Sequence, residues 1–455
     1  MWNFSGGAAV VVLAGCVASC ERVPALDPIP TTGTHFLVGR YGAAGAPDTT
    51  FGHDGFVAID FGGTSRANAI AVDAQRRYFV AGEAESGGYR QFAVASLHEH
   101  GNRNARVDGD GRLIVGFSGP QGWARDLAMD RHGGALLTWP YVVGRTEGAD
   151  GIRVAIARIG EFGPEADFGI GGLVEGTFPG LTNPQAYAVA VDAESRVVVV
   201  CDSDGDRGFF LVRYLADGRL DGTFASRGVG RVPWPGITQA AGLNLTIDAR
   251  GRHLVSGWAS PTGSFAHATV ARYDASGALD RTFGTAGVAM VVPEGFLDES
   301  LVAIMESEVA GLTLLDDGRI RMIVAVAFRD DRGLLVSRSF LAGLNADGRP
   351  DPSFDASGFI PLTVPGVPSP HLTAITTSGE RVVIVGSGET EVPPPAARRT
   401  QGILLGFRPD GRRDLAFGSS GVARRDFPLG RSGQLLDVIV DTVGRLVVAG
   451  LVQFD

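Results

Sequence analysis

Seven imperfect copies of one unit run through this chain of 455 residues, and the repetition constrains its fold more than any other feature. In most copies a strand-like run ends in Arg-Tyr or an equivalent. A turn follows that reads Asp-Gly-x-x-Asp-x-x-Phe-Gly-x-x-Gly. The aromatic position of this turn recurs every 56 to 71 residues, at Phe51, Val107, Phe168, Phe224, Phe283, Phe354 and Phe417. Seven copies at this period predict an all-β fold, a seven-bladed β-propeller of four-stranded antiparallel blades.

Each unit contains four runs of strand length, and two of them form a hairpin around a polar turn. The hairpin is clearest where residues 186–191 and 196–200 flank Asp192, because both runs are rich in β-forming residues. Equivalent turns fall near Asp73, Asp130, Asp248, Asp316, Thr377 and Asp441. The two hairpin runs are the second and third runs of the unit; the fourth is the Arg-Tyr strand, and the first run of the next unit follows the Phe-Gly turn.

The two ends of the chain complement each other. The last copy stops at Asp455 without its Arg-Tyr strand, whereas the first ordered segment, Phe36 to Tyr41, is such a strand. We therefore expect the termini to share one blade and close the ring, because blade faces are covered only by neighbouring blades. If the Ala-Val-Asp run is innermost, each terminus gives two strands. If the run after Phe-Gly is innermost, closure is three plus one.

The unit resembles the delta-60 repeat, a family of bacterial predicted propellers, over about residues 34–455. Asp217-Gly-Arg-Leu-Asp221-Gly-Thr-Phe224 fits the family consensus closely, as does the segment from Gly277 to Gly284. The layout is also similar to propellers of the NHL class, and this analogy favours the Ala-Val-Asp run as the innermost strand. The delta-60 resemblance implies a fold and no established activity.

The N-terminus resembles a bacterial lipoprotein signal. A short apolar stretch ends in Leu13-Ala14-Gly15-Cys16, which matches a lipobox, although the residues before it contain no Arg or Lys. The resemblance implies a signal peptide over 1–15, acylation of Cys16 and a membrane anchor. Residues 16–33 then form a tether, and 34–455 form the propeller. Because Val17 rather than Asp follows the cysteine, lipoprotein sorting implies an outer-membrane location in the cell envelope. The alternative is an ordinary apolar leader.

Composition narrows the classes of partner. The formal net charge is −10, and all forty basic residues are Arg. No basic stripe is visible, so the sequence disfavours nucleic acid as a partner. If Cys16 is acylated, only Cys20 and Cys201 remain, and two cysteines establish no disulfide framework.

The mouth of the central channel is the predicted binding region. Seven residues before the hairpin Asp or its equivalent, the copies differ from one another although their turns are regular. This column holds Arg66, Trp123, Gln185, Ala241, Glu308, Pro370 and Gln434, and beside it lie Asn68, Arg125, Asp126 and His371. The candidate ligand-binding residues are Arg66, Trp123, Arg125, Asp126, Gln185, Glu308, His371 and Gln434. Ordinary loop diversity is the alternative explanation.

No cofactor is predicted. The run from Asp202 to Asp206 places three carboxylates two residues apart, as in some Ca²⁺ loops, but it lacks the distal Glu of an EF-hand, so a polar hairpin turn is the favoured interpretation. His98-Glu-His100 occupies a turn column, where solvated histidines are expected. The sequence contains no Gly-x-Ser-x-Gly, His-Glu-x-x-His, P-loop or paired-Cys zinc motif.

Three functions remain open. The favoured one is a lipid-anchored, monomeric envelope protein that binds or scaffolds a glycan, peptide or protein through one propeller face. The second is a propeller-type hydrolase or lyase with carboxylates such as Asp126 and Glu308 at the mouth. The third is a passive structural spacer, for which a shallow mouth and a lateral apolar patch are expected.

Overall fold

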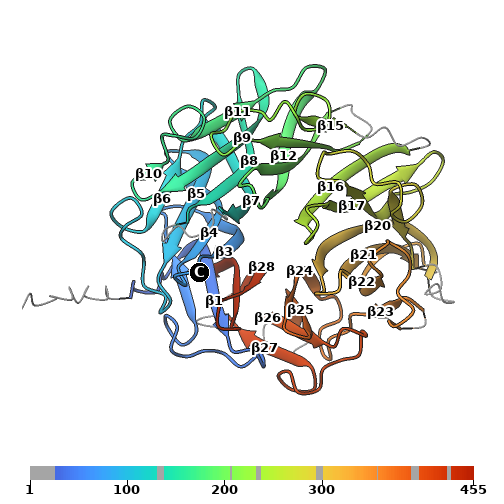
Figure 1. Ribbon diagram of the computed structural model, residues 1–455. Coiled ribbons are helices and arrows are strands. Elements are labelled where there is room, and N and C mark those ends of the chain that lie inside the picture. Colours follow the sequence, from blue (N-terminus) through green and yellow to red (C-terminus); the bar gives the residue numbers. More distant parts are fainter. Residues whose placement is uncertain are drawn as a thin grey trace, which may run out of the picture.

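The chain folds as a ring of seven antiparallel sheets around a central channel (Figure 1). This computed structural model describes residues 26–130, 138–204, 208–231, 237–293, 301–330, 332–355, 357–390, 399–427 and 432–454. None of these residues belongs to a helix long and apolar enough to cross a membrane. Cys16 and Cys20, and with them the predicted signal peptide, lie outside the described residues.

We number the blades from the one that contains both termini. Blade 1 consists of β28 (Ser432–Val440), β29 (Leu446–Phe454), β1 (Gly33–Tyr41) and β2 (Phe56–Ile59). Blade 2 consists of β3 (Ser65–Val72), β4 (Tyr78–Ser86), β5 (Tyr89–Leu97) and β6 (Arg112–Val115). Blade 3 consists of β7 (Gln121–Met129), β8 (Pro140–Gly148), β9 (Gly151–Gly160) and β11 (Leu173–Gly176), with the short β10 (Gly163–Pro164) also pairing with β9.

The remaining blades follow in chain order. Blade 4 consists of β12 (Thr182–Val191), β13 (Val197–Asp204), β14 (Phe210–Tyr214) and β15 (Val229–Arg231). Blade 5 consists of β16 (Ile237–Ile247), β17 (His253–Pro261), β18 (His267–Tyr273) and β19 (Val288–Val291). Blade 6 consists of β20 (Leu301–Leu314), β21 (Ile320–Asp330), β22 (Leu335–Leu344) and β23 (Phe359–Pro361). Blade 7 consists of β24 (His371–Ser378), β25 (Arg381–Thr390), β26 (Arg399–Phe407) and β27 (Val422–Asp426).

The strand that contains the Ala-Val-Asp run is innermost in every blade. Around the channel β3 contacts β7, β7 contacts β12, and the series continues through β16, β20, β24 and β28 back to β3. The prediction of seven blades is therefore confirmed, as is closure with two strands from each terminus. The alternative of three strands plus one is wrong.

The hydrophobic core is divided among the junctions between blades. Seven clusters of buried apolar side chains are present, and each combines residues of two neighbouring blades. In β1, Leu37 and Tyr41 join the cluster shared with blade 7, whereas Phe36 and Val38 join the one shared with blade 2. This alternation follows from the two-residue period of a strand. No blade buries its apolar faces alone, so the ring depends on closure.

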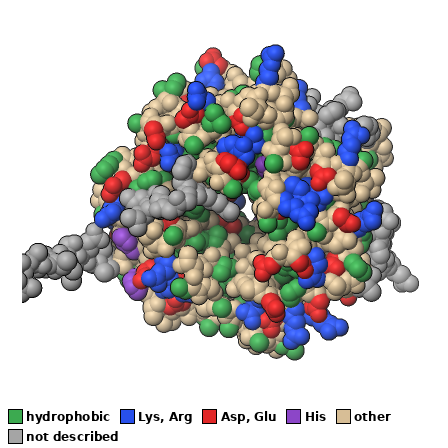
Figure 2. All heavy atoms as spheres, viewed as in Figure 1, with side chains coloured by type: hydrophobic (Ala, Val, Ile, Leu, Met, Phe, Trp, Pro, Cys, Tyr) green, Lys and Arg blue, Asp and Glu red, His purple; other side chains and the backbone are tan. Residues whose placement is uncertain are grey.

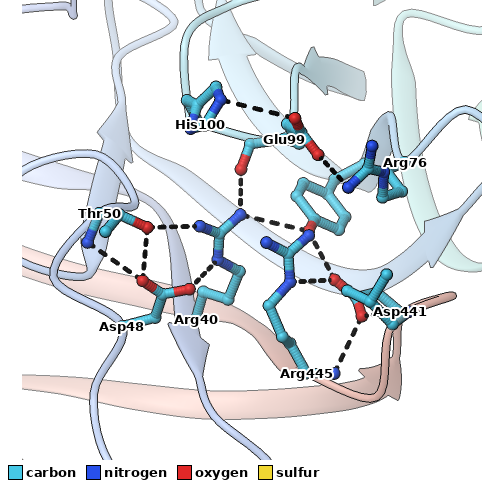
Figure 3. A network of polar contacts seen from close by, with 10 residues as sticks. Arg40, Asp48, Thr50, Arg76, Glu99, His100, Asp441 and Arg445 are labelled. Atoms are coloured by element: carbon cyan, nitrogen blue, oxygen red, sulfur yellow. Dashed lines mark hydrogen bonds and ion pairs between the residues drawn. The ribbon is translucent and has the colours of Figure 1, made fainter.

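The closing strands pair along their whole length. β1 pairs with β29 from Gly33 opposite Phe454 to Tyr41 opposite Leu446. A polar network joins this junction to blade 2 (Figure 3). The Tyr78 hydroxyl donates to Asp441 over 3.0 Å, and Arg445 donates to the same hydroxyl over 3.2 Å. Arg40 of β1 binds Asp48 over 2.8 Å and donates to the Glu99 carbonyl.

The repeated turn contains an arginine clamp that links each of five blades to the next. In blade 4, Arg213 binds Asp221 over 2.8 Å and lies 4.4 Å over the Phe224 ring, and it donates to the Ala275 carbonyl of blade 5 over 2.7 Å. Gly277 of blade 5 has a φ of +85°, and a Cβ there would lie 2.6 Å from the Phe224 ring. The Arg, Asp, Phe and Gly of the repeat thus form one contact between blades. The other clamps are Arg40, Arg272, Arg321 and Arg381, over Phe51, Phe283, Phe354 and Phe417.

Part of the predicted tether lies against the ring. Asp27 forms an ion pair with Arg103 of the blade 2 turn, and its carbonyl lies 2.6 Å from the His53 imidazole of the blade 1 turn. Ile29 packs against the cluster between blades 7 and 1. The chain therefore meets the ring at the face that carries the repeated turns.

Candidate functional site at the mouth of the channel

The two faces of the ring differ in regularity. The inner strands all run in the same direction, so their first residues meet at one face and the hairpin Asp residues meet at the other. We call these the mouth face and the turn face. The turn face also carries the Asp-Gly turns and the arginine clamps, whereas the mouth face carries the variable connections. Figure 2 shows acidic and basic side chains interspersed around the ring, with a hollow at its centre.

The predicted site residues lie near the mouth face, on six blades. They are Arg66 on β3, Trp123, Arg125 and Asp126 on β7, Gln185 on β12, Glu308 on β20, His371 on β24 and Gln434 on β28. The structure brings the residues of blades 2, 3 and 4 onto neighbouring inner strands. Glu308 lies across the channel from them. His371 and Gln434 are exposed and lie on the adjacent inner strands β24 and β28, and β28 also adjoins β3.

Each mouth residue has a cross-strand partner that sequence reasoning missed as a site residue. Arg66 pairs with Glu83, Trp123 with Arg145, Gln185 with Asp202, and Ala241 with Trp258. Directly opposite side chains on an antiparallel pair lie close together, so these second-strand residues belong to the same surface. The sequence contained a signal for these residues, because an alignment of the second strands of the hairpins would place them in one column.

Blades 2 to 4 form a basic sector of the mouth with two aromatic rings. The Arg145 guanidinium lies 4.4 Å over the Trp123 ring and donates to the Gln185 amide oxygen over 2.7 Å. Arg125 lies 5.9 Å over the Tyr187 ring. Tyr187 is a further residue that sequence reasoning missed. Arg66 adds a third cation from the neighbouring inner strand.

The positive charge of this sector is incompletely balanced. Burial lowers the pKa of Arg66, Glu83 raises it, and the neighbouring cations Arg125 and Arg90 lower it. Within the described part of the chain, neither Arg66 nor Arg125 forms an ion pair with a carboxylate. Glu83 itself binds Arg90 over 3.3 Å. Glu83 is thus shared between Arg66 and Arg90, and cations that outnumber the carboxylates beside them favour an anion in the space between them.

Asp202 is the acidic member of the basic sector. Burial raises the pKa of its carboxyl, contacts with the Gln185 amide and the Tyr187 hydroxyl lower it, Asp204 raises it and Arg145 lowers it. The net shift is upward. Burial, and then Asp202, raise the pKa of Tyr187 to about 12, so this phenol is a neutral hydrogen-bonding group at physiological pH. The sector therefore offers amide, hydroxyl and guanidinium groups to a ligand.

Across the channel an acidic cavity lies between blades 5 and 6. It has a volume of about 540 Å³, and its walls include Gln239, Trp258, Phe265, Glu306 and Glu308. Burial raises the pKa of Glu308, and the neighbouring Glu306 raises it further. Trp258 is thus a second aromatic residue at the mouth. The mouth as a whole is cationic on one side and anionic on the other.

Below the mouth, every inner strand contains a β-bulge. A register shift lies at an equivalent place in each of β3, β7, β12, β16, β20, β24 and β28, and β12, β16 and β20 contain further shifts nearer their first residues. Side chains at five of these bulges bind the backbone of the next inner strand. Asn68 donates to Ala124, Asn244 to Val309 and Thr373 to Leu435, while Asp126 accepts from Val189 and Asp437 from Ile70. We call these five side chains the bulge belt.

Asp126 belongs to the bulge belt rather than to the open mouth. One carboxylate oxygen accepts from Val189 over 2.9 Å and the other accepts from Leu127 over 2.8 Å. Both oxygens are therefore engaged, and the bond to Val189 holds blade 3 against blade 4. Asn68 has a comparable role, since its amide joins blade 2 to blade 3 over 2.8 Å.

We expect the belt to make stability depend on pH. Burial raises the pKa of Asp126 to about 7, and the carboxylate of Asp437 contributes to this rise. An unfolded Asp titrates near pH 4, so between pH 4 and 7 the unfolded chain binds fewer protons and the free energy of unfolding falls. Asp126→Asn should remove this contribution. The difference in melting temperature between this variant and the unsubstituted protein should increase from pH 4 to pH 8. Asp150→Asn, at an exposed carboxylate, should keep a constant difference over this range. A constant difference for Asp126→Asn would contradict the raised pKa of Asp126.

The predicted calcium loop is only partly described, since Asp206 lies outside the described residues. Asp204 accepts a hydrogen bond from Asn183 over 2.7 Å, which ties it to the inner strand. No group of three or more His, Cys, Asp or Glu side chains within the described ranges is arranged to hold a metal ion.

Three further cavities belong to the ring itself. The channel at the turn face is a cavity of about 700 Å³ with largely apolar walls, including Ile70, Leu127 and Val191. A cavity of about 1080 Å³ lies between the outer parts of blades 5 and 6. Another, of about 1100 Å³, lies between the outer parts of blades 3 to 5. The latter two are formed mainly by outer strands and repeated turns, which splay apart at blade junctions.

Comparison with known proteins gives the fold and little more. A family model described as a domain of unknown function (DUF5122) beta-propeller matches residues 251–283. That match begins after Asp248 and spans β17, the Arg-Tyr strand β18 and the repeated turn up to Phe283. None of the curated proteins matches the chain.

Solved propellers resemble the chain at low identity. A PQQ-bound aldose sugar dehydrogenase from Streptomyces coelicolor is 11% identical, with a TM-score of 0.39 and coverage of 85% of this chain and 94% of that one. Sqt1 from Chaetomium thermophilum is 12% identical, with a TM-score of 0.39 and coverage of 87% and 97%. Semaphorin 1b from Drosophila is 10% identical, with a TM-score of 0.35 and coverage of 85% and 86%. These diverse proteins transfer no function to the chain.

Proposed function

We propose that the protein is a lipid-anchored binding propeller of the bacterial cell envelope, which recognises an anionic group of a polar ligand at its mouth. The observation that carries the proposal is the basic sector, where Arg66, Arg125 and Arg145 converge beside Trp123 and Tyr187. Guanidinium groups bind carboxylates through paired hydrogen bonds, and half-buried aromatic rings supply apolar contact. A carboxylate of a glycan, peptide or protein is the group that this sector fits.

The position of the N-terminal segment supports this arrangement. Asp27, which follows Cys16 by eleven residues, is held at the turn face by Arg103 and His53. We propose that an anchor at Cys16 holds the turn face toward the membrane and leaves the mouth open to ligands. Outer-membrane sorting through Val17 and a monomeric ring are parts of the same proposal.

Binding is favoured over hydrolysis by the state of the carboxylates. A glycosidase-type site needs two carboxyl groups placed around one bond. Asp126 uses both oxygens in the bulge belt, and Glu308 lies on the opposite side of the channel. Asp126 and Glu308, the two carboxylates that the hydrolase hypothesis names, therefore do not flank one bond.

The test is a binding titration with labelled acidic probes, an oligogalacturonate and a Glu-rich peptide, on the full chain. We expect Arg66→Gln with Arg125→Gln to weaken binding of the preferred probe roughly tenfold to hundredfold, because two charge-assisted contacts are lost. The matched control is Arg219→Gln together with Arg412→Gln, two exposed arginines of the turn face. Equal affinity in both double variants, or no binding of either probe, would contradict the proposal.

A further inference from the structure

We propose that the acidic cavity between blades 5 and 6 holds a basic side chain of a peptide ligand, whose acidic group binds the basic sector across the channel. The binding of the ligand's acidic group at the basic sector rests on the proposed function. The binding of the ligand's basic side chain rests on the acidic cavity itself. Together they name the ligand class as a peptide that carries both charges.

The cavity opens at the mouth and combines apolar walls with negative charge. Gln239 and Glu306 lie toward the mouth-face ends of β16 and β20. Trp258 lies toward the end of β17 that pairs with the mouth-face end of β16. Phe265, in the connection between β17 and β18, is 53% exposed and completes the apolar wall. Its volume of about 540 Å³ lies within the range of pockets that hold small ligands.

The two carboxylates of the cavity lie close together without a positively charged partner among the described residues. Glu306 and Glu308 are separated by one residue on β20, so their side chains leave the same face of the strand. Within the described ranges neither forms an ion pair with Arg or His. Both side chains are exposed, and partial desolvation together with the neighbouring Glu306 raises the pKa of Glu308. A cation placed between the two carboxylates would remove their repulsion.

The aromatic walls favour an organic cation over a metal ion. Arg and Lys side chains lay their apolar stems along apolar surfaces and place their charge at a polar end. Trp is the aromatic residue that binds such cations best. A Ca²⁺ site needs six to eight oxygen ligands, whereas this cavity offers two carboxylates beside Trp258 and Phe265. The cavity therefore fits the side chain of a partner's Arg or Lys.

The two charged regions of the mouth face one another. β20 lies across the channel from β3 and β7 (Figure 1), which carry Arg66 and Arg125. A peptide that spans the mouth with an acidic residue at one end and a basic residue at the other complements both regions. A uniformly charged chain meets attraction at one side and repulsion at the other.

The experiment compares peptides of equal length on the full chain by fluorescence polarisation. One peptide carries two Glu and two Arg residues separated by a Gly-Ser spacer, in either order. The other replaces the two Arg residues with Gln. We expect one order of the bipolar peptide to bind at least roughly tenfold more tightly than its acidic counterpart, as one additional desolvated ion pair allows.

Variants separate this inference from the proposed function. Glu306→Gln with Glu308→Gln should abolish the advantage of the bipolar peptide without weakening the acidic one, and Trp258→Ala should reduce that advantage. Glu194→Gln, an exposed carboxylate of the turn face, is the matched control and should change neither. Acidic-peptide binding without a bipolar advantage would overturn the inference and leave the proposed function intact. Calorimetric Ca²⁺ binding lost in the double Glu variant would also overturn it. If only the oligogalacturonate binds, the peptide class is wrong, and if no probe binds, both proposals fail.

Discussion

Replacing Gly33–Tyr41 (β1) with a Gly-Ser linker of equal length is expected to abolish the cooperative unfolding transition of the ring. β1 is the only partner of β2 in the blade and pairs with the whole of β29. Phe36, Leu37, Val38 and Tyr41 are almost fully buried. Losing four such side chains costs about 1.5–3 kcal/mol each, which is comparable to the whole stability of a typical domain at about 5–15 kcal/mol.

Urea unfolding followed by circular dichroism measures this effect. The linker variant should show a broad, non-cooperative change, because both clusters that flank blade 1 lose residues of β1. Leu37→Ala provides a graded comparison, with an expected loss of about 2–5 kcal/mol in the free energy of unfolding. If the linker variant unfolded at the urea concentration of the unsubstituted protein, closure by the termini would not stabilise the ring.

Arg321→Ala is expected to reduce the free energy of unfolding by about 3–5 kcal/mol, the cost of breaking a buried ion pair by removing one partner. The Arg321 side chain is fully buried and binds Asp351, itself 3% exposed, over 2.6 Å. It also donates to the Pro409 carbonyl of blade 7 over 2.8 Å and lies 4.8 Å over the Phe354 ring. The substitution leaves the Asp351 carboxylate buried without this partner.

The matched control is Arg219→Ala in the corresponding turn of blade 4. Arg219 also binds an aspartate, Asp217, over 2.7 Å, but its side chain is 77% exposed. Exposed pairs contribute about 0–1 kcal/mol, so this variant should unfold close to the unsubstituted protein in guanidinium chloride. Equal losses in the two variants would show that the clamp does not carry the contact between blades.

The repeat made the fold predictable, since a constant turn at a constant period identifies the blades and the complementary termini identify the closing blade. Two of the clamps were not predictable. In blades 6 and 7 the position of the motif's Arg is taken by Gly343 and Gly406, and the clamp comes instead from Arg321 and Arg381 of the neighbouring strands. The space over each Phe is filled in both cases, but by a residue from a different strand.

The candidate site was predictable as a region and less so as a set of residues. Alignment on the hairpin Asp located Arg66, Trp123 and Gln185 at the mouth. It also included Asp126, because a bulge changes which side chains face the channel and leaves no mark in the alternation of the sequence. Arg145 and Trp258 were missed because only the inner strands were aligned, whereas these residues form a column of their own on the second strands, opposite Trp123 and Ala241.

Ligand binding at the basic sector is tested most directly by hydrogen–deuterium exchange of the full chain with and without its tightest-binding acidic probe. We expect the probe to slow exchange at the mouth-face ends of β3, β7 and β12 and at the paired ends of β8 and β13. The Arg219→Gln variant should show the same protection. Protection confined to the repeated turns or to the grooves between outer strands would contradict it, because the ligand would then bind away from the basic sector.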